Sequence, residues 1–202
     1  MTPLEMNLSY GLAWLSFGAG HSFLASARAK NLFEALLNPY YRITYNAIAS
    51  VHIIAVWLIG NRVFEGTDSF KPPVEAGIAL TSLSILGLIL LAIALKRYDL
   101  GRLSGLSQIR NHKLGITEAN PEPLHVDGLH AYIRHPIYLG AYLILWGNSQ
   151  DLHGLTTAIW GTAYLYIGTI YEERYLTKTY GDAYRTYRDR VPSIIPWRGK
   201  AV

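Results

Sequence analysis

Apolar and polar residues alternate in long blocks along this 202-residue chain, not at the two-residue period of a half-buried strand. Three apolar blocks are close to the roughly 20 residues that a helix needs to cross the hydrocarbon of a bilayer. They are Leu8–Ser26, Ile43–Gly60 and Ala76–Leu95, and His21 and His52 are the only Asp, Glu, Lys, Arg or His residues inside them. The pattern predicts three membrane-spanning helices in the first half of the chain.

Two shorter apolar blocks follow, Pro136–Ser149 and Leu155–Tyr171, with Gln150–Gly154 between them. Either block alone could be a re-entrant or buried segment. As a closely joined pair they predict a helical hairpin. The predicted fold class is therefore all-α: an integral membrane helical bundle of about five transmembrane helices. It forms a single domain, with three spans in 1–95 and the long loop, the hairpin and a tail in 96–202.

The composition agrees with a membrane location. Half of the residues are hydrophobic and only 16% are charged, below the usual quarter. The chain has no cysteine, which excludes disulfides, thiolate metal sites and a cysteine nucleophile. The net charge of +4 comes from basic residues between the apolar blocks and in the tail, so it favours anionic membrane lipid as a partner over nucleic acid. No Lys or Arg precedes Arg28, which argues against a cleaved signal peptide with a basic start.

The distribution of basic residues predicts the orientation. With five spans, sixteen of the eighteen Lys and Arg residues fall on one side, in segments 26–43 and 95–136 and in the tail. Only Arg62 and Lys71 fall on the other side. Because cytoplasmic loops carry the excess of Lys and Arg, the N-terminus is predicted to lie outside and the C-terminus in the cytoplasm.

The densest group of polar residues surrounds the fourth block. Arg134 and His135 directly precede Pro136, and proline is best tolerated in the first turn of a helix. His135 is therefore the predicted N-cap of an apolar helix that runs from Ile137 to about Asn148, and such a helix start suits an anion. Glu172 and Glu173 lie at the far end of the next apolar helix. In a hairpin they return to the level of Arg134 and His135.

Several motifs in fixed order carry a resemblance to a known family. They are RHPIYLG at 134–140, EERYL at 172–176, GDAYRTYRDRVP at 181–192 and IIPW at 194–197. Together they make the segment 124–197 resemble the isoprenylcysteine carboxyl methyltransferase superfamily of integral-membrane methyltransferases. HSFLAS at 21–26, YRITYN at 41–46 and YDLGRLSGLSQIR at 98–110 are similar to its methanethiol S-methyltransferase branch. Related membrane proteins associated with nitric oxide reductase begin in the same way.

The resemblance implies S-adenosylmethionine as cofactor, folded among the last helices near the cytoplasmic face. No G-x-G-x-x-G follows a predicted strand, so a Rossmann-type site is not expected. Carried over position by position, the implied cofactor-binding residues are Gln108, Leu124, His125, Val126, His130, His135, Pro136, Ile137, Tyr138 and Glu172, with Leu124–Val126 on the adenosine side.

The two catalytic candidates are Arg134 and Glu173. Glu173 is one helical position on from Glu172 and is predicted to face elsewhere, so a role toward solvent or lipid headgroups is an equal alternative for it. The structural alternative for Arg134, His135 and Glu172 is an ion-pair network that holds the hairpin together. No metal site and no obligate protein partner are predicted.

Gly168 bears on the methyl acceptor. In the prenylcysteine branch an arginine that meets the substrate carboxylate lies four residues before the first acid of the pair, and here that position is Gly168. Glycine cannot pair with a carboxylate. A small thiol such as methanethiol is therefore the favoured acceptor, and a lipid-like or prenylcysteine carboxylate is the alternative.

Two histidines and three tyrosines admit more than one interpretation. His21 and His52 lie only roughly 6 Å apart in depth, so they could bind haem or a metal, line a substrate path, or join two helices. Haem binding would accompany a non-enzymatic accessory protein of the nitric oxide reductase-associated type. Tyr180, Tyr184 and Tyr187 recur at spacings of four and three, which predicts one face of a short helix. An interfacial aromatic anchor is the favoured interpretation, and a direct role at the cofactor is the alternative.

Overall fold

The structure is a computed structural model that describes residues 1–67, 70–116, 123–198 and 200. These residues form helices and connecting segments and include no strand, so the predicted all-α class is confirmed. The chain divides into two compact units. The first comprises Met1–Gly66 and Tyr98–Asn120, and the second comprises Thr67–Arg97 and Pro121–Val202.

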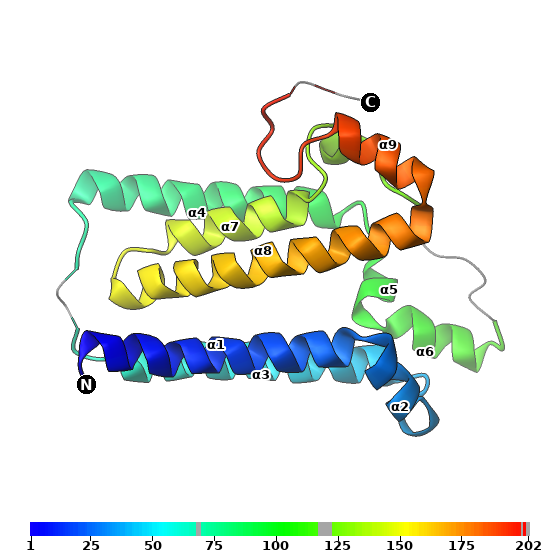
Figure 1. Ribbon diagram of the computed structural model, residues 1–202, viewed down its shortest axis with the longest axis horizontal. Coiled ribbons are helices and arrows are strands. Elements are labelled where there is room, and N and C mark those ends of the chain that lie inside the picture. The colour runs from blue at the N-terminus through cyan, green and yellow to red at the C-terminus, as the bar shows by residue number, and fades with distance from the viewer. Residues whose placement is uncertain (68–69, 117–122, 199, 201–202) are drawn as a thin grey trace. The chain divides into compact units, whose positions relative to one another are not determined.

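The first unit is built on two long helices, α1 (Pro3–Ala25) and α3 (Tyr41–Val63), which pack side by side (Figure 1). Thr2 starts α1 with a capping box: its hydroxyl accepts from the Glu5 backbone N–H and the Glu5 carboxylate accepts from the Thr2 backbone N–H. The buried residues of this pair include Tyr10, Trp14 and Val56. Aromatic side chains therefore fill the contact between the two helices.

Polar contacts also join α1 to α3. Tyr45 Oη lies 2.5 Å from His21 Nε2, and Ser16 Oγ lies 3.1 Å from His52 Nε2. The ring of Phe17 lies between the two histidines, with ring centroids 5.4 Å and 5.6 Å away. Both histidines thus bond across the helix pair, as their helix-packing interpretation predicts.

Three short helices complete the first unit: α2 (Ala27–Leu37), α5 (Leu100–Ser104) and α6 (Leu106–Lys113). Gly105 separates α5 from α6 with a φ of 101°, where a side chain would be strained. Its α-carbon also lies so near α3 that an added Cβ would be 2.7 Å from the Ile43 nitrogen. The turn between α5 and α6 is therefore held directly against the start of α3.

The second unit contains α4 (Val74–Leu95), α7 (Pro136–Gly147) and α8 (Leu152–Tyr180), together with the 3-10 helix η1 (Gly128–Ala131) and α9 (Asp182–Arg190). The closest packing is between α4 and α7, where backbones nearly touch. A Cβ on Gly87 would lie 2.7 Å from the Gly140 carbonyl oxygen, and one on Gly147 would lie 2.4 Å from Ser84 Oγ. Small residues at such positions are typical of helix pairs in membranes.

Helix α7 begins as the sequence predicts, because His135 is its N-cap and Pro136 its first residue. Helix α8 packs against α7, and its N-cap is Asp151, whose carboxylate accepts from the Gly154 N–H at 2.6 Å. It continues to Tyr180, well past the apolar block that ends at Tyr171, and stops at Gly181, whose φ is 57°. Tyr180 thus belongs to α8 and not to the helix that carries Tyr184 and Tyr187.

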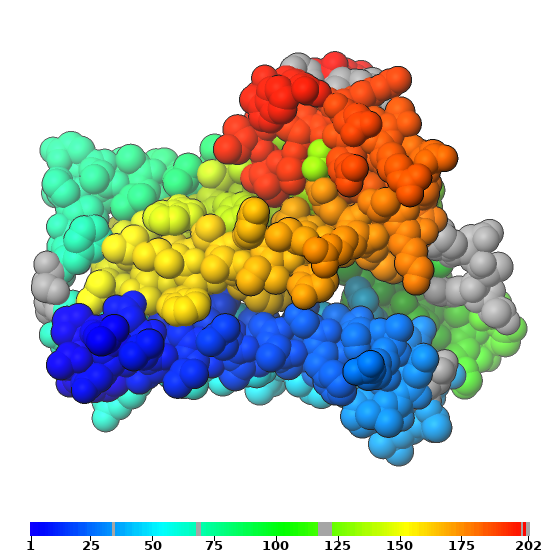
Figure 2. Space-filling view, viewed as in Figure 1, coloured from blue at the N-terminus to red at the C-terminus, as the bar shows by residue number. Residues whose placement is uncertain are grey.

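Two helices, α3 and α4, are long and apolar enough to cross a membrane, and α7 is a shorter apolar helix. Most of the side chains of α3 and α4 are not buried inside the structure, and Val51 and Ile78 are examples of exposed apolar residues. Figure 2 shows side chains of α4 at the surface of the second unit, and exposed apolar side chains on a helix of this length suit lipid.

Candidate functional site

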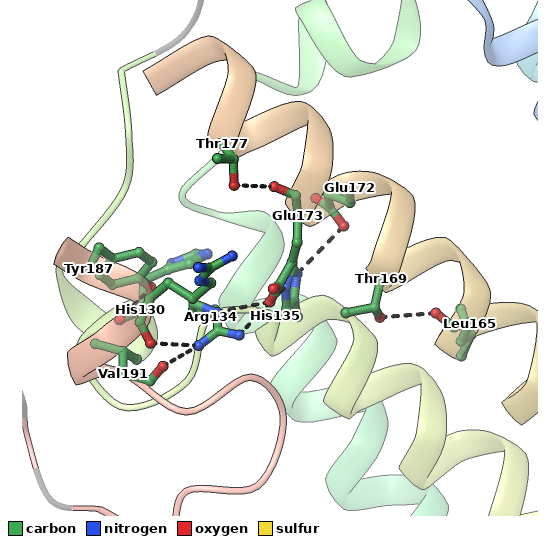
Figure 3. A network of polar contacts seen from close by, with 11 residues as sticks. His130, Arg134, His135, Leu165, Thr169, Glu172, Glu173, Thr177, Tyr187 and Val191 are labelled. Carbon is green, nitrogen blue, oxygen red and sulfur yellow. Dashed lines mark hydrogen bonds and ion pairs between the residues drawn. The ribbon is translucent and has the colours of Figure 1, made fainter. Parts of the chain in front are cut away.

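The site is assembled in the second unit where the chain enters α7. Arg134 and His135 form backbone hydrogen bonds to the segment after α9: the Arg134 N–H donates to the Pro192 carbonyl at 2.9 Å, and the His135 N–H donates to the Ser193 carbonyl at 3.0 Å. The entry to α7 is therefore joined to residues nearly sixty positions later in the sequence. Figure 3 shows the side chains that gather around it.

Arg134 is engaged with the protein on several sides. Its Nε and Nη2 donate to Glu173 Oε1 at 2.9 and 2.5 Å. Its Nη1 donates to the carbonyls of Arg188 and Val191, at 3.0 and 2.5 Å. These two carbonyls lie at the C-terminal end of α9, where a cation is favourable. Only 10% of the Arg134 side chain is exposed, so this residue ties α8 to the end of α9.

His135 lies between two carboxylates, as Figure 3 shows. Its Nε2 is 3.0 Å from Glu173 Oε1, and its Nδ1 is 3.5 Å from Glu172 Oε2. Its ring also stacks on Tyr138, with ring centroids 5.5 Å apart and an interplanar angle of 14°. Tyr138 lies one turn into α7, so the stack of the two rings joins His135 to the first turns of that helix. Glu172, His135 and Tyr138 therefore form one connected group.

The prediction that Glu173 faces away from this group is wrong. Both acids converge on His135, because the imidazole has a nitrogen on each side and neighbouring residues on α8 can each reach one of them. The two acids nevertheless differ in environment. Glu173 is 19% exposed and bonded to Arg134, whereas Glu172 is 40% exposed and has no arginine partner among the described side chains. Glu172 is thus the acid with room to bind a ligand.

The charges in the group follow from these contacts. Burial would raise the pKa of Glu173, but hydrogen bonds from His135 and Arg134 and their positive charge lower it to about 2. Burial likewise opposes ionisation of Glu172, and His135 and Tyr138 more than compensate, so its pKa is lowered too. Burial would lower the pKa of His135, but the bonds to Glu172 and Glu173 raise it. Two carboxylates with lowered pKa therefore flank the imidazole, and both stabilise its protonated form relative to a free histidine.

His130 is buried and belongs to η1, the 3-10 helix that precedes α7. Its carbonyl accepts from the Tyr187 hydroxyl at 2.7 Å, and its ring lies 6.0 Å from the ring of His125. Burial, with a smaller contribution from His125, lowers the pKa of His130 to about 4, so the ring is neutral at pH 7. The structure therefore brings His125 and His130 together, both of which the resemblance assigned to the cofactor.

Tyr184 and Tyr187 lie on one face of α9, as their spacing predicts, but that face is buried. With Val191 they form a small core, against which Leu124, Val126, Leu176 and Tyr180 pack. Their interpretation as an interfacial anchor is therefore wrong. Leu124 and Val126, expected to line the adenosine side of a ligand, contact this core.

The remaining expected residues divide between the two units. Pro136 and Ile137 form the first turn of α7, with Pro136 buried and Ile137 partly buried. Gln108 lies on α6 in the first unit, where its side-chain amide donates to the Arg102 carbonyl at 3.3 Å. The sequence analysis did not predict that Tyr187, Val191 and Pro192 bond to the segment that leads into α7. The only sequence signal for these contacts was that the three residues lie in the motif at 181–192.

No group of three or more His, Asp or Glu side chains suited to a metal ion exists within the described ranges.

Comparison with known proteins identifies relatives for most of the chain. This chain is 31% identical over 184 residues to methanethiol S-methyltransferase 1 of Bradyrhizobium diazoefficiens. The aligned residues are 90% of this chain and 64% of that protein. The chain is 27% identical to methanethiol S-methyltransferase of Crocosphaera subtropica, over 91% of this chain and 72% of that protein. The chain thus spans a little under two thirds of the length of the first relative.

A third relative represents another activity. Protein-S-isoprenylcysteine O-methyltransferase of Schizosaccharomyces pombe is 38% identical over 79 residues, which are 36% of this chain and 33% of that protein. No family model and no solved structure matches the chain. The named relatives nevertheless confirm the resemblance found in the motifs: the chain is similar to proteins named methanethiol S-methyltransferase and, over a shorter stretch, to one named protein-S-isoprenylcysteine O-methyltransferase.

Proposed function

We propose that this chain is a membrane-embedded methyltransferase that uses S-adenosylmethionine to methylate a small thiol such as methanethiol. The observation that carries the proposal is its similarity, along 90% of its length, to a protein named methanethiol S-methyltransferase 1. The group formed by Glu172, His135 and Tyr138 supplies a site at which the donor could bind. The shared length does not cover the whole relative, so both activity and acceptor rest on this proposal.

The chemistry of the site fits S-adenosylmethionine. Glu172 offers an ionised, partly exposed carboxylate, which can accept hydrogen bonds from an amine or from hydroxyl groups. Tyr138, whose ring stacks on His135, and His125, whose ring is tilted by 38° against that of His130, are only partly buried and supply aromatic surface. When bound, the cofactor supplies a methyl group already activated by its sulfonium sulfur. The protein then needs mainly to position the acceptor and exclude water.

Each residue of the site has its own part in this proposal. Glu172 holds the donor, while Arg134 and Glu173 keep His135 in place and hold the end of α9 beside it. Because both ring nitrogens of His135 face carboxylates of the protein, neither is open to take a proton from the acceptor. The acceptor would therefore enter as a thiolate or lose its proton elsewhere. Ile137, Leu124 and Val126 are only partly buried and would supply apolar walls, whereas Pro136 is fully buried and sets the first turn of α7. Gln108 stays a candidate from the resemblance alone.

The membrane topology is part of the proposal. Helices α1, α3, α4 and α7 and the apolar part of α8, Leu155–Tyr171, are its five spans, with α7 and α8 as the hairpin and residues 1–202 as one functional domain. The length of α1 supports its inclusion, because 23 helical residues extend about 34 Å at 1.5 Å per residue. The Lys and Arg distribution supports an outside N-terminus, and it puts the α7 entry and the acid pair in the cytoplasm.

A methyl-transfer assay tests the activity. Membranes that contain the chain, or the purified protein, are given S-adenosylmethionine labelled in its methyl group, with methanethiol, larger thiols and lipid-like carboxylates as acceptors. Label is expected in the volatile product from methanethiol. Transfer only to a carboxylate would favour the alternative acceptor class. No transfer to any acceptor, together with no binding of S-adenosylhomocysteine by calorimetry, would reject the proposal.

The second candidate is the haem-binding accessory protein. Its support is the pair His21 and His52 on adjacent long helices. The contacts of their Nε2 atoms with Tyr45 and Ser16 favour a packing role instead. A visible spectrum of the purified protein separates the two, because a Soret band that disappears in His52→Ala would support haem binding.

A further inference from the structure

Two short helices of the first unit carry the same exposed pattern. On α2, Arg28, Leu32 and Leu36 are all exposed and share one face, at spacings of four residues. On α6 and its C-cap, Leu106, Arg110 and Leu114 do the same. Leu36 is 80% exposed and Leu114 is 64% exposed. Each set, here called a stripe, combines leucine with one arginine that has no ion-pair partner among the described side chains.

The two helices are attached to the unit by other faces. Ala29 of α2 is fully buried, and Ser107 of α6 is nearly so. The α5–α6 turn is held to the start of α3, because Asn46 Nδ2 donates to the carbonyls of Leu103 and Ser104 at 2.9 and 3.0 Å. The stripes are therefore outer surfaces of fixed helices, and something other than this unit's own core must solvate their leucines.

The position of the stripes along α3 indicates what covers them. Helix α3 has 23 residues and a length of about 34 Å, a little more than the roughly 30 Å of hydrocarbon. Its first turns, which hold the α5–α6 turn, therefore lie at the boundary between hydrocarbon and headgroups. Helix α2 ends three residues before α3 begins, and Figure 1 shows α2, α5 and α6 gathered at this end of the α1–α3 pair.

Charge identifies the kind of surface. Segments 26–43 and 98–116 hold six Lys and Arg residues, namely Arg28, Lys30, Arg42, Arg102, Arg110 and Lys113, against only Glu34 and Asp99. Leucine next to arginine on one helical face suits an interface, because the side chain of arginine can lie along apolar surface and extend its charge to the headgroups. Lipids with anionic headgroups add attraction for each such residue.

We infer that the stripes of α2 and α6 form a surface that binds the anionic lipid of the membrane face on which α3 begins. The leucines enter the boundary layer, and Arg28 and Arg110 pair with lipid headgroups. This inference rests on the proposed membrane span of α3 and is independent of the methyl-transfer activity. It gives the long connection before residue 124 a role in anchoring.

The absence of cysteine makes a labelling test clean. Leu32→Cys and Leu114→Cys place a fluorophore on each stripe, and Lys30→Cys and His112→Cys place it on exposed positions of the same helices outside the stripes. The variants are reconstituted in nanodiscs of phosphatidylcholine with phosphatidylglycerol. Lipids spin-labelled near the headgroup should quench positions 32 and 114 strongly, whereas aqueous iodide should quench positions 30 and 112.

A label at Ile54→Cys, in the middle of α3, separates the inference from the topology. If lipid that is spin-labelled deep in its acyl chains fails to quench it, the membrane span itself is wrong. If lipid quenches position 54 while iodide quenches positions 32 and 114 as strongly as positions 30 and 112, the surface is aqueous and the inference is rejected. Protection from both quenchers in a dimeric protein would show that a second copy covers the stripes, which also rejects it.

Lipid charge is tested with arginine variants. At position 114, spin-labelled phosphatidylglycerol should quench more than spin-labelled phosphatidylcholine. Arg110→Gln should reduce that preference by about fivefold. Arg62→Gln removes the same charge at the opposite end of α3, where Arg62 is exposed and paired with Glu65, and should leave the preference unchanged. Equal effects of the two variants would show that position 110 makes no specific lipid contact.

Discussion

Arg134 holds Glu173, the second acid of the pair on α8, with Nε and Nη2 at 2.9 and 2.5 Å from one carboxylate oxygen. Glu172, directly before it, makes no such contact and is the more exposed of the two. Glu173 thus forms the structural ion pair, and its neighbour Glu172 is the candidate for ligand contact. Substitutions that keep size and remove charge should separate the two roles.

Glu173→Gln should mainly lower stability. It leaves Arg134, which is 10% exposed, without its carboxylate partner, and breaking a buried ion pair on one side costs about 3 kcal/mol at the low end. Thermal unfolding of ligand-free protein in detergent measures this loss. Asp182→Asn is a matched control, because it removes a carboxylate from an exposed pair with Arg185 and should change little. An unfolding temperature in Glu173→Gln equal to that of the control would contradict the clamp.

Glu172→Gln should mainly lower cofactor affinity. A hydrogen bond to a charged group contributes about 1.5–3 kcal/mol. Because the Glu172 side chain is 40% exposed, we expect a loss at the low end of this range, which corresponds to about tenfold weaker binding. Calorimetric titration with S-adenosylhomocysteine measures it. The unfolding temperature of ligand-free protein should fall less than in Glu173→Gln. Unchanged affinity would remove Glu172 from the binding site.

The same ion pairs predict a dependence of stability on pH. The pKa of Glu173 is lowered from 4.5 to about 2, so its contribution is complete above pH 4.5 and is lost as the pH falls toward 2. The pKa of His135 is raised above 6.5, so its contribution is complete below pH 6.5 and is lost as the pH rises through the higher value.

Thermal unfolding measured across a range of pH tests both predicted pH dependences, that of Glu173 and that of His135. The stability difference between wild type and Glu173→Gln should shrink as the pH falls below 4.5. The difference between wild type and His135→Gln should shrink as the pH rises above 6.5. His112→Gln, at an exposed position on α6, serves as the histidine control. A His135 difference that grows with pH would show that the buried ring is held neutral.

The sequence predicted the parts of this site that depend on local rules. Pro136 marks the start of α7 because its ring suits a first helical turn, and the apolar run carries the helix to Gly147. The end of α8 was less predictable. Its polar continuation after Tyr171 contains no breaker before Gly181, so the helix extends beyond the apolar block that defined it in the sequence.

The pairing of charges needed the tertiary structure. Whether Glu172 or Glu173 meets Arg134 depends on how α8 is rotated about its axis against the entry of α7, and no sequence pattern encodes that rotation. The burial of Tyr184 and Tyr187 is similar. Tyrosines at that spacing can face headgroups or a core, and only the packing of Leu124 and Val126 against them decides which.

Gly168 tests the proposed acceptor. A Cβ there would meet only the Tyr138 hydroxyl, at 3.7 Å, which is ordinary contact, and Glu172 lies one turn further along α8. Gly168→Ala should therefore be tolerated. Gly168→Arg should place a guanidinium beside Tyr138 and Glu172, where it hinders a small apolar thiol and can admit a carboxylate. Methyl transfer to methanethiol, measured for both variants, checks this. Equal thiol kinetics in the two would show that position 168 does not face the acceptor.

Gly87 tests the packing that supports the site, since α7 carries His135 at its start and is held against α4. A Cβ on Gly87 would lie 2.7 Å from the Gly140 carbonyl oxygen and 2.9 Å from the Ile144 nitrogen, and backbone atoms cannot move aside as a flexible side chain can. Gly87→Ala should therefore force α4 and α7 apart, at a cost of about 1–3 kcal/mol.

Gly77 provides the matched control on the same helix, because its nearest atom to an added Cβ is Gln150 Oε1 at 3.8 Å. Both substitutions gain the same helix propensity, up to about 1 kcal/mol for alanine over glycine. Gly77→Ala should thus unfold in detergent at the wild-type temperature or above, and Gly87→Ala clearly below it. Gly140→Ala should resemble Gly87→Ala, since its Cβ would lie 3.0 Å from the Gly87 carbonyl oxygen. A rise in unfolding temperature for all three variants would mean that α4 and α7 do not pack this closely.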